Sequence, residues 1–251
     1  MTTNQPPVAL ITGANKGLGL EIARQLAQQG IRVVLGSRDL AKGQTAAAQL
    51  TAAGLDAAAV QLDVTNPADI AALPAFFHNH YAGLDILINN AGISLDFQDT
   101  TDWTRPTAGS ISLNRLRQTF ETNFFAVVAI TQTLLPLLLV SPAGRIVNQS
   151  SILGSLAMHS DPHSPVYNLK PFAYNSSKAA LNAFTIHLAH ELQDTPIKVN
   201  SAHPGWVKTD MGGEEAPMEI QDGAKTAVWL ATLPPTGPTG RFFHHQDELP
   251  W

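Results

Sequence analysis

Tyr174 and Lys178, in the sequence YNSSK, are the two residues whose types and spacing most directly indicate chemistry. Residues four apart on a helix share one face, with Cβ atoms about 5–6 Å apart. A free phenol has a pKa of about 10, so it exchanges protons poorly near neutral pH. At ~4 Å and an effective dielectric of ~20, attraction to an ammonium is worth about 4 kcal/mol, which lowers the phenol pKa by as much as ~3. We therefore predict a general acid/base pair, although the same spacing also occurs on solvated helix faces.

The composition limits the classes of protein to consider. The chain has 251 residues, of which 44% are hydrophobic and 14% charged, so it can bury a sizeable core. A net charge of −5 argues against nucleic acid or an anionic membrane as the main partner. There is no cysteine, which excludes disulfides, thiolate metal sites and a cysteine nucleophile.

Two further features concern location. The start of the chain, MTTNQPPVALITG, lacks the basic segment and long apolar run of a signal peptide, and a chain without cysteine fits the cytosol, so we expect a cytoplasmic protein. The most apolar stretch, Phe124 to Val140, contains Thr131, Gln132, Thr133 and Pro136. We interpret it as a buried helix and expect no membrane partner.

Short apolar segments alternate with longer segments rich in Ala, Leu and Gln. The predicted strands are Val8–Ile11, Ile31–Leu35, Ala58–Leu62, Asp85–Ile88, Arg145–Asn148, Ile197–Ser201 and Arg241–Phe243. The predicted helices are Gly17–Gln29, Ala41–Ala53, Pro67–His80, Gln118–Leu139 and Phe172–Leu192. This alternation predicts an α/β fold: a single Rossmann-type doubly wound domain, with a parallel sheet of about seven strands and helices on both faces.

Within this single domain, 1–251, we expect residues 1–92 mainly to bind a dinucleotide and residues 93–251 to carry the catalytic residues and substrate loops. Three irregular regions interrupt the alternation: Ser94–Ser112, Gly154–Pro171 and Trp206–Pro217. Long loops at strand ends in such folds usually shape the substrate site.

A glycine-rich turn, TGANKGLG, joins the first predicted strand to the first helix. Gly13 permits a tight turn, Gly17 lets the backbone approach a pyrophosphate, and Gly19 allows close packing of helix on strand. The helix N-terminus adds amides and the positive end of a dipole. The spacing is G-x-x-x-G-x-G, and we assign Asn15 and Leu18 of this turn to the cofactor site as well.

The end of the second predicted strand bears on the type of dinucleotide. Gly36 and Ser37 stand where an acidic residue would bind a ribose 2′-hydroxyl. Arg38, with Lys16 from the glycine loop, would instead hold a 2′-phosphate. The alternative is that both are ordinary surface cations; we favour NADP(H). Asp39 we interpret as the cap of the next helix.

Two further turns belong to the predicted cofactor site. Asp63, next to Val64, has a carboxylate that would accept a hydrogen bond from the adenine amino group, or else would cap a helix or loop. Asn90, Ala91 and Gly92 follow the fourth strand and offer amides in a small-residue turn, suited to close contact with cofactor or backbone.

Taken together, these motifs make the chain resemble a short-chain dehydrogenase/reductase along nearly its whole length. The matching features are TGANKGLG, Asp63, NNAG, Asn123, Ser151, the Tyr174/Lys178 pair and the turn His203-Pro204-Gly205. The segments NKGLG, HPGWVKTDMGG and GRFF…PW are most similar to the carbonyl-reductase-like branch of that family.

The resemblance implies roles for individual residues. Tyr174 would give a proton to the carbonyl oxygen, or accept it in the reverse direction, and Ser151, with Ser150 as the alternative, would orient that oxygen. Lys178 would lower the tyrosine pKa and hold the nicotinamide ribose, and Asn123 would anchor a water. The resemblance also implies cofactor contacts from Val64, Tyr174, Lys178, Pro204, Gly205, Val207 and Thr209.

The distance from Ser151 to Tyr174 is longer than is usual in the family, because of an insertion within Gly154–Pro171. In carbonyl reductases such an insertion can shield a surface used for oligomerisation, so monomer and homo-oligomer both stay open. Apolar residues of the irregular regions would either pack these loops or line a pocket for a hydrophobic ketone or aldehyde. They are Leu95, Phe97, Trp103, Leu153, Met158, Phe172, Trp206, Met211 and Met218.

We therefore expect an NADPH-dependent carbonyl reductase acting reversibly on a small-molecule carbonyl or alcohol. An NADP-dependent alcohol dehydrogenase working mainly in oxidation is the second reading. The third is a non-catalytic NADP(H)-sensing protein, which the presence of both Tyr174 and Lys178 disfavours. We expect no metal, because the spacing of His187 and His190 does not match a zinc-peptidase motif.

Overall fold

A computed structural model describes residues 5–96 and 105–251 of the chain. Its centre is one sheet in the order β3-β2-β1-β4-β5-β6-β7-β8, parallel except for the last pair, β7 and β8. The strands are β1 (Val8–Thr12), β2 (Arg32–Ser37), β3 (Ala57–Gln61), β4 (Ile86–Asn89), β5 (Arg145–Gln149), β6 (Lys198–His203), β7 (Arg241–His244) and β8 (Asp247–Glu248). The predicted α/β fold with seven parallel strands is confirmed, and the short antiparallel β8 is an addition.

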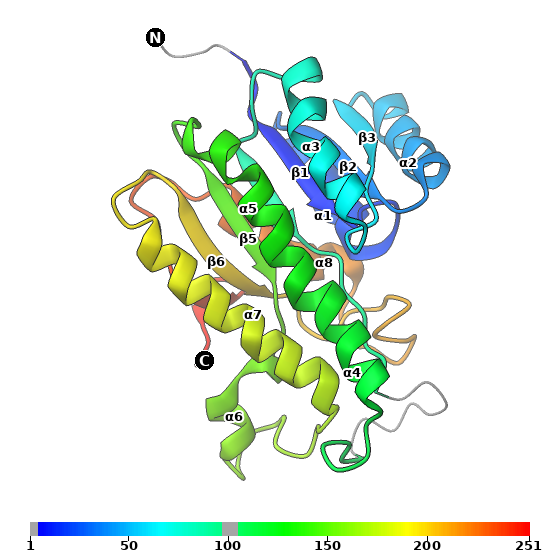
Figure 1. Cartoon of the computed structure of the whole chain (residues 1–251), viewed down its shortest axis with the longest axis vertical. Coiled ribbons are helices and arrows are strands. Elements are labelled where there is room, and N and C mark those ends of the chain that lie inside the picture. The colour runs from blue at the N-terminus through cyan, green and yellow to red at the C-terminus, as the bar shows by residue number, and fades with distance from the viewer. Residues whose placement is uncertain (1–4, 97–104) are drawn as a thin grey trace.

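Helices cover both faces of the sheet (Figure 1). Helices α1 (Gly17–Gln28), α2 (Leu40–Ala52) and α8 (Ile220–Ala231) share one apolar core with the sheet, and α3 (Pro67–His80), α5 (Ala126–Leu139) and α7 (Phe172–Glu191) share the other. In Figure 1 the second set lies across the front. The remaining described helices are α4 (Leu113–Phe120) and α6 (Leu156–Ser160), with a π-helical turn at Glu121–Phe125 and a 3₁₀ turn at Ile152–Gly154.

The alternation of side chains along β1 explains why two cores form. Successive side chains of a strand point to opposite faces. Ala9 and Ile11 lie in the core under α1 and α8, whereas Val8 and Leu10 lie in the core under α3 and α5. A strand buried on both sides needs the continuous apolar sequence VALI rather than an apolar–polar alternation.

Besides the added β8 and the short α6 within the predicted irregular region Gly154–Pro171, two longer helical segments differ from the prediction. The helix predicted at Gln118–Leu139 begins at Leu113 and contains the π-helical turn. Helix α8 was not predicted, because it follows the irregular region Trp206–Pro217 and carries Gly223 in its second turn, which weakens a helical pattern.

The continuous helical segment from Leu113 to Leu139 is the one described helix that is long and apolar enough to cross a membrane, with a mean hydropathy of 1.7 in its most apolar stretch. Core helices of globular domains meet the same criterion. Here Ile130, Leu134 and Leu138 pack into the core beside α3. The segment therefore has the buried helical face that its sequence predicts.

Substitution of Phe77 in α3 tests the packing of the core beneath this helix. Its side chain is fully buried, whereas its neighbour Phe76 is only partly buried. We expect Phe77→Ala to lower the free energy of unfolding by about 3–5 kcal/mol, since it removes buried contacts and leaves a cavity. Phe76→Ala should cost clearly less. Urea unfolding of both variants measures the difference, and equal losses would contradict the described packing of α3.

Candidate active site

Tyr174 and Lys178 lie one turn apart on α7, on a face that is buried against the ends of the strands. The Lys178 Nζ atom is 5.6 Å from the centre of the Tyr174 ring. It also donates a hydrogen bond of 2.7 Å to the main-chain carbonyl of Gln149, the last residue of β5. The ammonium is thus fixed between the sheet and the phenol ring.

Burial decides the protonation of this pair. Desolvation raises the pKa of Tyr174 to about 12, and a hydrogen bond from Ser151 acts in the opposite direction. Desolvation also lowers the pKa of Lys178 to about 8. Each shift favours the neutral form, because a low-dielectric interior penalises charge. The predicted lowering of the phenol pKa is therefore wrong for this pair, because desolvation of the buried phenol is the largest cause and raises its pKa.

The two serines that follow β5 point in different directions. Ser151 hydrogen-bonds the Tyr174 side chain, and its Oγ accepts the amide of Leu153 at 3.2 Å. Ser150 Oγ instead donates to Asn182 Oδ1 at 2.6 Å. Of the two candidates for the substrate-orienting hydroxyl, the structure places Ser151 beside the phenol.

Asn123 is fully buried in the π-helical turn. Its amide accepts the main-chain N–H of Ile93 at 2.8 Å and donates to the Ile93 carbonyl, also at 2.8 Å. It donates as well to Ser177 Oγ at 3.0 Å. Both N–H groups of the side chain are therefore used inside the protein, and its role at a bound water stays a prediction.

The N-terminus of α1 suits an anionic ligand. Gly17 adopts a positive φ of 60°, and a Cβ built there would meet nothing within 4 Å, so the glycine turn faces open space. Lys16, the residue that precedes the helix, forms no side-chain cap, and the amides of Leu18 and Gly19 have no hydrogen-bond partner in the described chain. Unpaired amides at a helix N-terminus form a site for phosphate groups, so this turn fits the pyrophosphate of a dinucleotide.

Thr12 connects the ends of β1 and β4, where the strand order changes direction. Its Oγ1 accepts the amides of Asn90 and Ala91, both at 3.0 Å, and its carbonyl accepts Asn90 Nδ2 at 2.9 Å. A Cβ on Gly19 would lie 2.5 Å from Asn90 Nδ2. Gly19 therefore packs closely against this turn, and a Cβ on Gly13 would meet Ala91 of the same turn at 3.1 Å. A Cβ on Gly92 would instead lie 3.4 Å from Asn123 Oδ1 and 3.5 Å from Lys178 Nζ. Thr12 is not among the site residues predicted from the sequence.

The side chains near the predicted 2′-phosphate site have different partners. Arg38 is exposed just after β2, and its guanidinium has no ion-pair partner in residues 5–96 and 105–251. Lys16 instead pairs with Asp210 of the loop after β6. Asp39 caps α2 through the amide of Lys42, as predicted.

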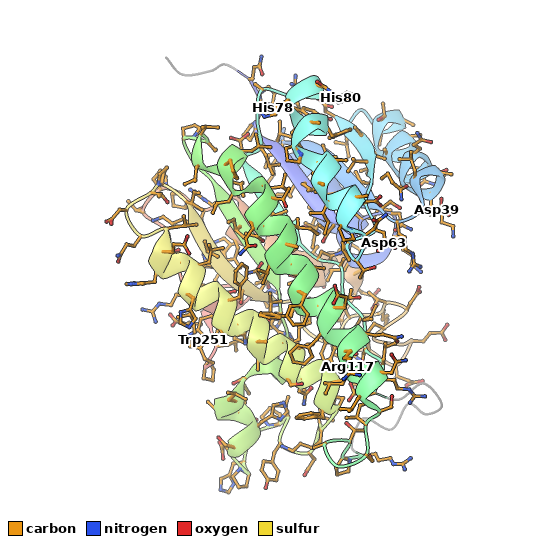
Figure 2. All side chains as sticks on the ribbon, in the orientation of Figure 1. Asp39, Asp63, His78, His80, Arg117 and Trp251 are labelled. Carbon is orange, nitrogen blue, oxygen red and sulfur yellow. The ribbon has the colours of Figure 1, made fainter. Side chains whose placement is uncertain are left out.

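Asp63 lies with Asp39 at the carboxyl edge of β2 and β3 (Figure 2). Its Oδ1 accepts both the amide of Thr65 at 3.0 Å and the Thr65 hydroxyl at 2.8 Å. Asp63 therefore caps the loop after β3, which is the alternative role predicted for it. A contact between Asp63 and adenine stays a prediction.

The loop after β6 brings Pro204, Gly205, Val207 and Thr209 to the same edge of the sheet. A Cβ on Gly205 would lie 2.7 Å from the sulfur of Met218, so this glycine accommodates Met218. Val207 is buried and forms an isolated bridge with Met218, and the Thr209 hydroxyl accepts the amide of Gly212 at 3.1 Å. The loop is therefore internally well connected, and its cofactor contacts stay predictions.

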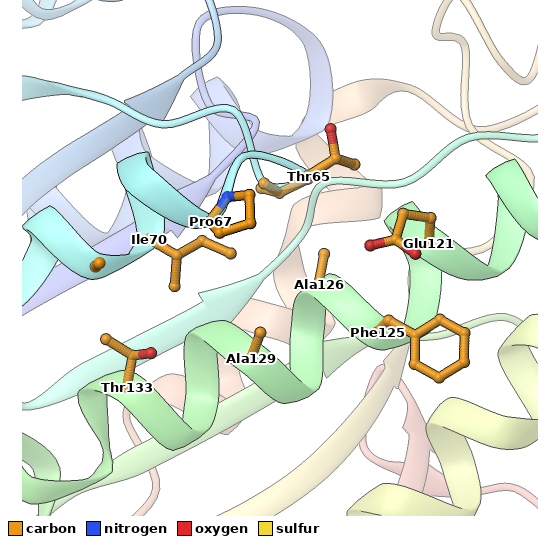
Figure 3. A pocket seen from close by; sticks show the side chains of 10 residues that line it. Thr65, Pro67, Ile70, Glu121, Phe125, Ala126, Ala129 and Thr133 are labelled. Carbon is orange, nitrogen blue, oxygen red and sulfur yellow. The ribbon is translucent and has the colours of Figure 1, made fainter.

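Two cavities lie elsewhere. One, of about 310 Å³, is lined by Val64, Pro67, Ile70, Glu121, Phe125 and Ala126, among others, between α3 and α5 (Figure 3). The other, of about 490 Å³, lies at the amino edge of the sheet beside Pro7, Asp85 and Arg145. Neither is lined by Ser151, Tyr174 or Lys178, so neither is the candidate site. Of the predicted pocket residues, Phe97 and Trp103 fall outside the described residues.

The insertion after Ser151 forms α6 and a loop at the start of α7 (Figure 1). The amide of Ala157 donates to the carbonyl of Trp251, and His159 and Lys170 contact each other. Two buried residues of the irregular region before α4, Asp96 and Thr107, contact the first turn of α7 and are also not among the predicted site residues. A buried acidic residue gives no recognisable pattern in a region without periodicity.

The structure combines a doubly wound parallel sheet, an uncapped glycine turn at its switch point and a buried Ser–Tyr–Lys group. This combination suits an oxidoreductase that uses a dinucleotide. Comparison with known proteins identifies the family. The profile described as "short chain dehydrogenase" matches residues 7–220. The chain belongs to the short-chain dehydrogenase family and is an oxidoreductase acting on CH–OH and C=O groups.

The similar proteins cover nearly the whole chain. Carbonyl reductase [NADPH] 1 of Mus musculus is 35% identical over 283 aligned positions, covering 98% of each chain. The solved structure of carbonyl reductase Sniffer of D. melanogaster has a TM-score of 0.82 at 28% identity, covering 99% of this chain and 100% of that one. The NADPH-bound carbonyl reductase from chicken fatty liver has a TM-score of 0.81 at 27% identity, covering 98% and 100%.

The lowered pKa of Lys178 predicts how stability changes with pH. Between about 8 and its ordinary value of 10.5, the unfolded chain keeps the Lys178 proton while the folded protein releases it. Stability rises with pH wherever the unfolded state binds more protons. We therefore expect the free energy of unfolding of the wild type to increase relative to that of Lys178→Met as pH rises from about 8 to 10.5. Urea unfolding across this range measures it, and a pH-independent difference would contradict the burial of the charge.

Proposed function

We propose that the protein is an NADPH-dependent carbonyl reductase that converts hydrophobic ketones or aldehydes to alcohols, reversibly. The observation that carries the proposal is the buried phenol of Tyr174, hydrogen-bonded by Ser151 and one turn from the ammonium of Lys178. The full-length similarity to proteins named carbonyl reductase [NADPH] supports it.

Each side chain has a role that its surroundings support. With a pKa raised to about 12, Tyr174 is protonated at neutral pH and is available as the acid that protonates a carbonyl oxygen. Ser151 donates a second hydrogen bond to that oxygen and orients it. Lys178 keeps a positive charge below a pH of about 8 and stabilises the phenolate left after proton transfer. When bound, NADPH supplies the hydride.

The choice of NADP(H) rests on the end of β2. The exposed Arg38 has no ion-pair partner in the described chain, and neither Gly36 nor Ser37 is acidic. A free guanidinium beside the predicted adenosine ribose suits a 2′-phosphate. Lys16 would add a second cation by exchanging its partner Asp210 for the phosphate.

The preference for hydrophobic substrates rests on apolar side chains that stay exposed near the site. Trp206 is 58%, Met211 40% and Phe172 38% exposed, and Phe172 precedes Tyr174 by two residues. Exposed large apolar side chains on segments that adjoin a site are typical of surfaces that bind apolar ligands.

Replacing Tyr174 tests the proton donor. We expect Tyr174→Phe to lower kcat for ketone reduction about 10²–10⁴-fold, since it removes general-acid catalysis, with NADPH binding retained. NADPH absorbance measures turnover against a panel of ketones, and fluorescence measures binding. Tyr167→Phe, in the insertion, is the matched control and should keep full activity. Wild-type turnover in Tyr174→Phe would refute the proposed function.

Replacing Arg38 tests the cofactor. Arg38→Ala should raise the Kd for NADPH roughly tenfold or more through loss of a charge-assisted hydrogen bond, while the Kd for NADH stays unchanged. Arg32 stands at the opposite end of the same strand, paired with Asp56, so Arg32→Ala is the control. Equal weakening of both cofactors by Arg38→Ala would exclude the phosphate contact.

A further inference from the structure

The first turn of α7 has its amides satisfied by side chains that are distant in sequence. The preceding residue, Pro171, provides no side-chain cap. The amide of Phe172 donates to Thr107 Oγ1 at 2.8 Å. The amides of Ala173 and Tyr174 donate to the two carboxylate oxygens of Asp96, at 2.8 and 2.9 Å. The next amide already makes the first hydrogen bond of the helix itself, to Pro171.

Asp96 and Thr107 act as one unit. Thr107 Oγ1 lies 2.9 Å from Asp96 Oδ1, to which it donates, and both residues are 5% exposed. Within the described chain no cation pairs with Asp96. The positive end of the α7 dipole and the helix amides therefore provide the compensation for a buried carboxylate.

The main chain of Tyr174 is held from both sides. Its N–H donates to Asp96, and its carbonyl accepts Ser177 Oγ at 2.7 Å. Ser177 Oγ in turn accepts Asn123 Nδ2, and the Asn123 amide is bonded in both directions to Ile93. Because Ile93 is three residues before Asp96, the hydrogen bonds close a ring around the main chain of Tyr174.

We propose that Asp96 and Thr107 are positioning residues for the reaction, because they fix the first turn of α7 and with it the place of the Tyr174 phenol. This inference rests on the proposed function of Tyr174. Without the carboxylate, the amide of Tyr174 is left without a partner and the first turn frays, as helix ends do when their orphan amides lack partners. A displacement of about 1 Å in a reacting group can reduce the rate about 10²-fold.

The experiment combines two readouts on the full-length protein. Hydrogen exchange of the amides of residues 172–174 reports the cap without any substrate, and steady-state kinetics reports the reaction. The variants are Asp96→Asn, whose single side-chain oxygen can serve only one of the two amides, and Thr107→Val, which removes the hydroxyl at nearly constant shape. Thr107→Ser keeps the hydroxyl and is the conservative rescue.

We expect faster exchange at residues 172–174 and a kcat lowered about ten- to a hundredfold in Asp96→Asn and Thr107→Val, with the Kd for NADPH unchanged. Thr107→Ser should behave as the wild type. Ser112→Ala is the matched control, because Ser112 Oγ accepts the amide of Arg115 at the start of α4 and takes no part in the hydrogen bonds at the first turn of α7. It should keep both exchange at 172–174 and kcat.

Three outcomes would overturn the inference. The first is unchanged hydrogen exchange at residues 172–174, and the second is faster exchange with wild-type kcat. The third is an equal loss of kcat and NADPH affinity together with a lowered Tm, which would indicate general destabilisation. If Asp96→Asn fails to fold, Thr107→Val decides alone, since the carboxylate remains. Failure of the proposed function is separate, because it shows as wild-type turnover in Tyr174→Phe while the exchange result still reports the cap.

Discussion

The parallel arrangement of seven strands is the constraint on which the rest of the structure depends. Parallel strands all end at one edge of a sheet, and each connection must return across a face before the next strand begins. The glycine turn after β1, Arg38 after β2, Asp63 after β3 and Ser151 after β5 therefore reach one edge from distant parts of the chain. At the switch point, the hydroxyl and carbonyl of Thr12 hold the turn after β4, which keeps the two halves of the edge in register.

Two helix N-termini at this edge differ in whether their first amides have hydrogen-bond partners. At α1 the amides of Leu18 and Gly19 have no partner in the described chain, and the glycine turn faces open space. At α7 a buried carboxylate and a hydroxyl occupy the first three amides. The same backbone chemistry thus offers a phosphate site at one helix and closes it at the other. For the proposed dinucleotide, this difference leaves the α1 N-terminus available to phosphate while the amides beside the phenol are already occupied.

The sequence predicts the parts of this protein that follow from local pattern. Three of these patterns involve only residues that are close in sequence. They are the continuous apolar strand VALI, the glycine spacing from Gly13 to Gly19 and the four-residue step from Tyr174 to Lys178. Contacts between distant segments are different. Asp96 and Thr107 lie in a region without periodicity, and their partners are 65 to 78 residues away. Neither the cap nor the role of Thr12 follows from local pattern, because only the folded chain brings these groups together.

The pKa of Tyr174 also differs from the prediction because it depends on the folded surroundings. Spacing alone gives the attraction between an ammonium and a phenolate, but it does not give the cost of placing either charge in the interior. Burial shifts both groups toward their neutral forms, so that Tyr174 holds its proton firmly while Lys178 remains charged below a pH of about 8. A phenol with this pKa is protonated at neutral pH, and in the proposed reaction it would donate its proton to an adjacent oxygen on which negative charge develops. In the proposed reaction the ammonium of Lys178 would offset part of the cost of forming a buried phenolate, because an opposite charge nearby favours the charged form.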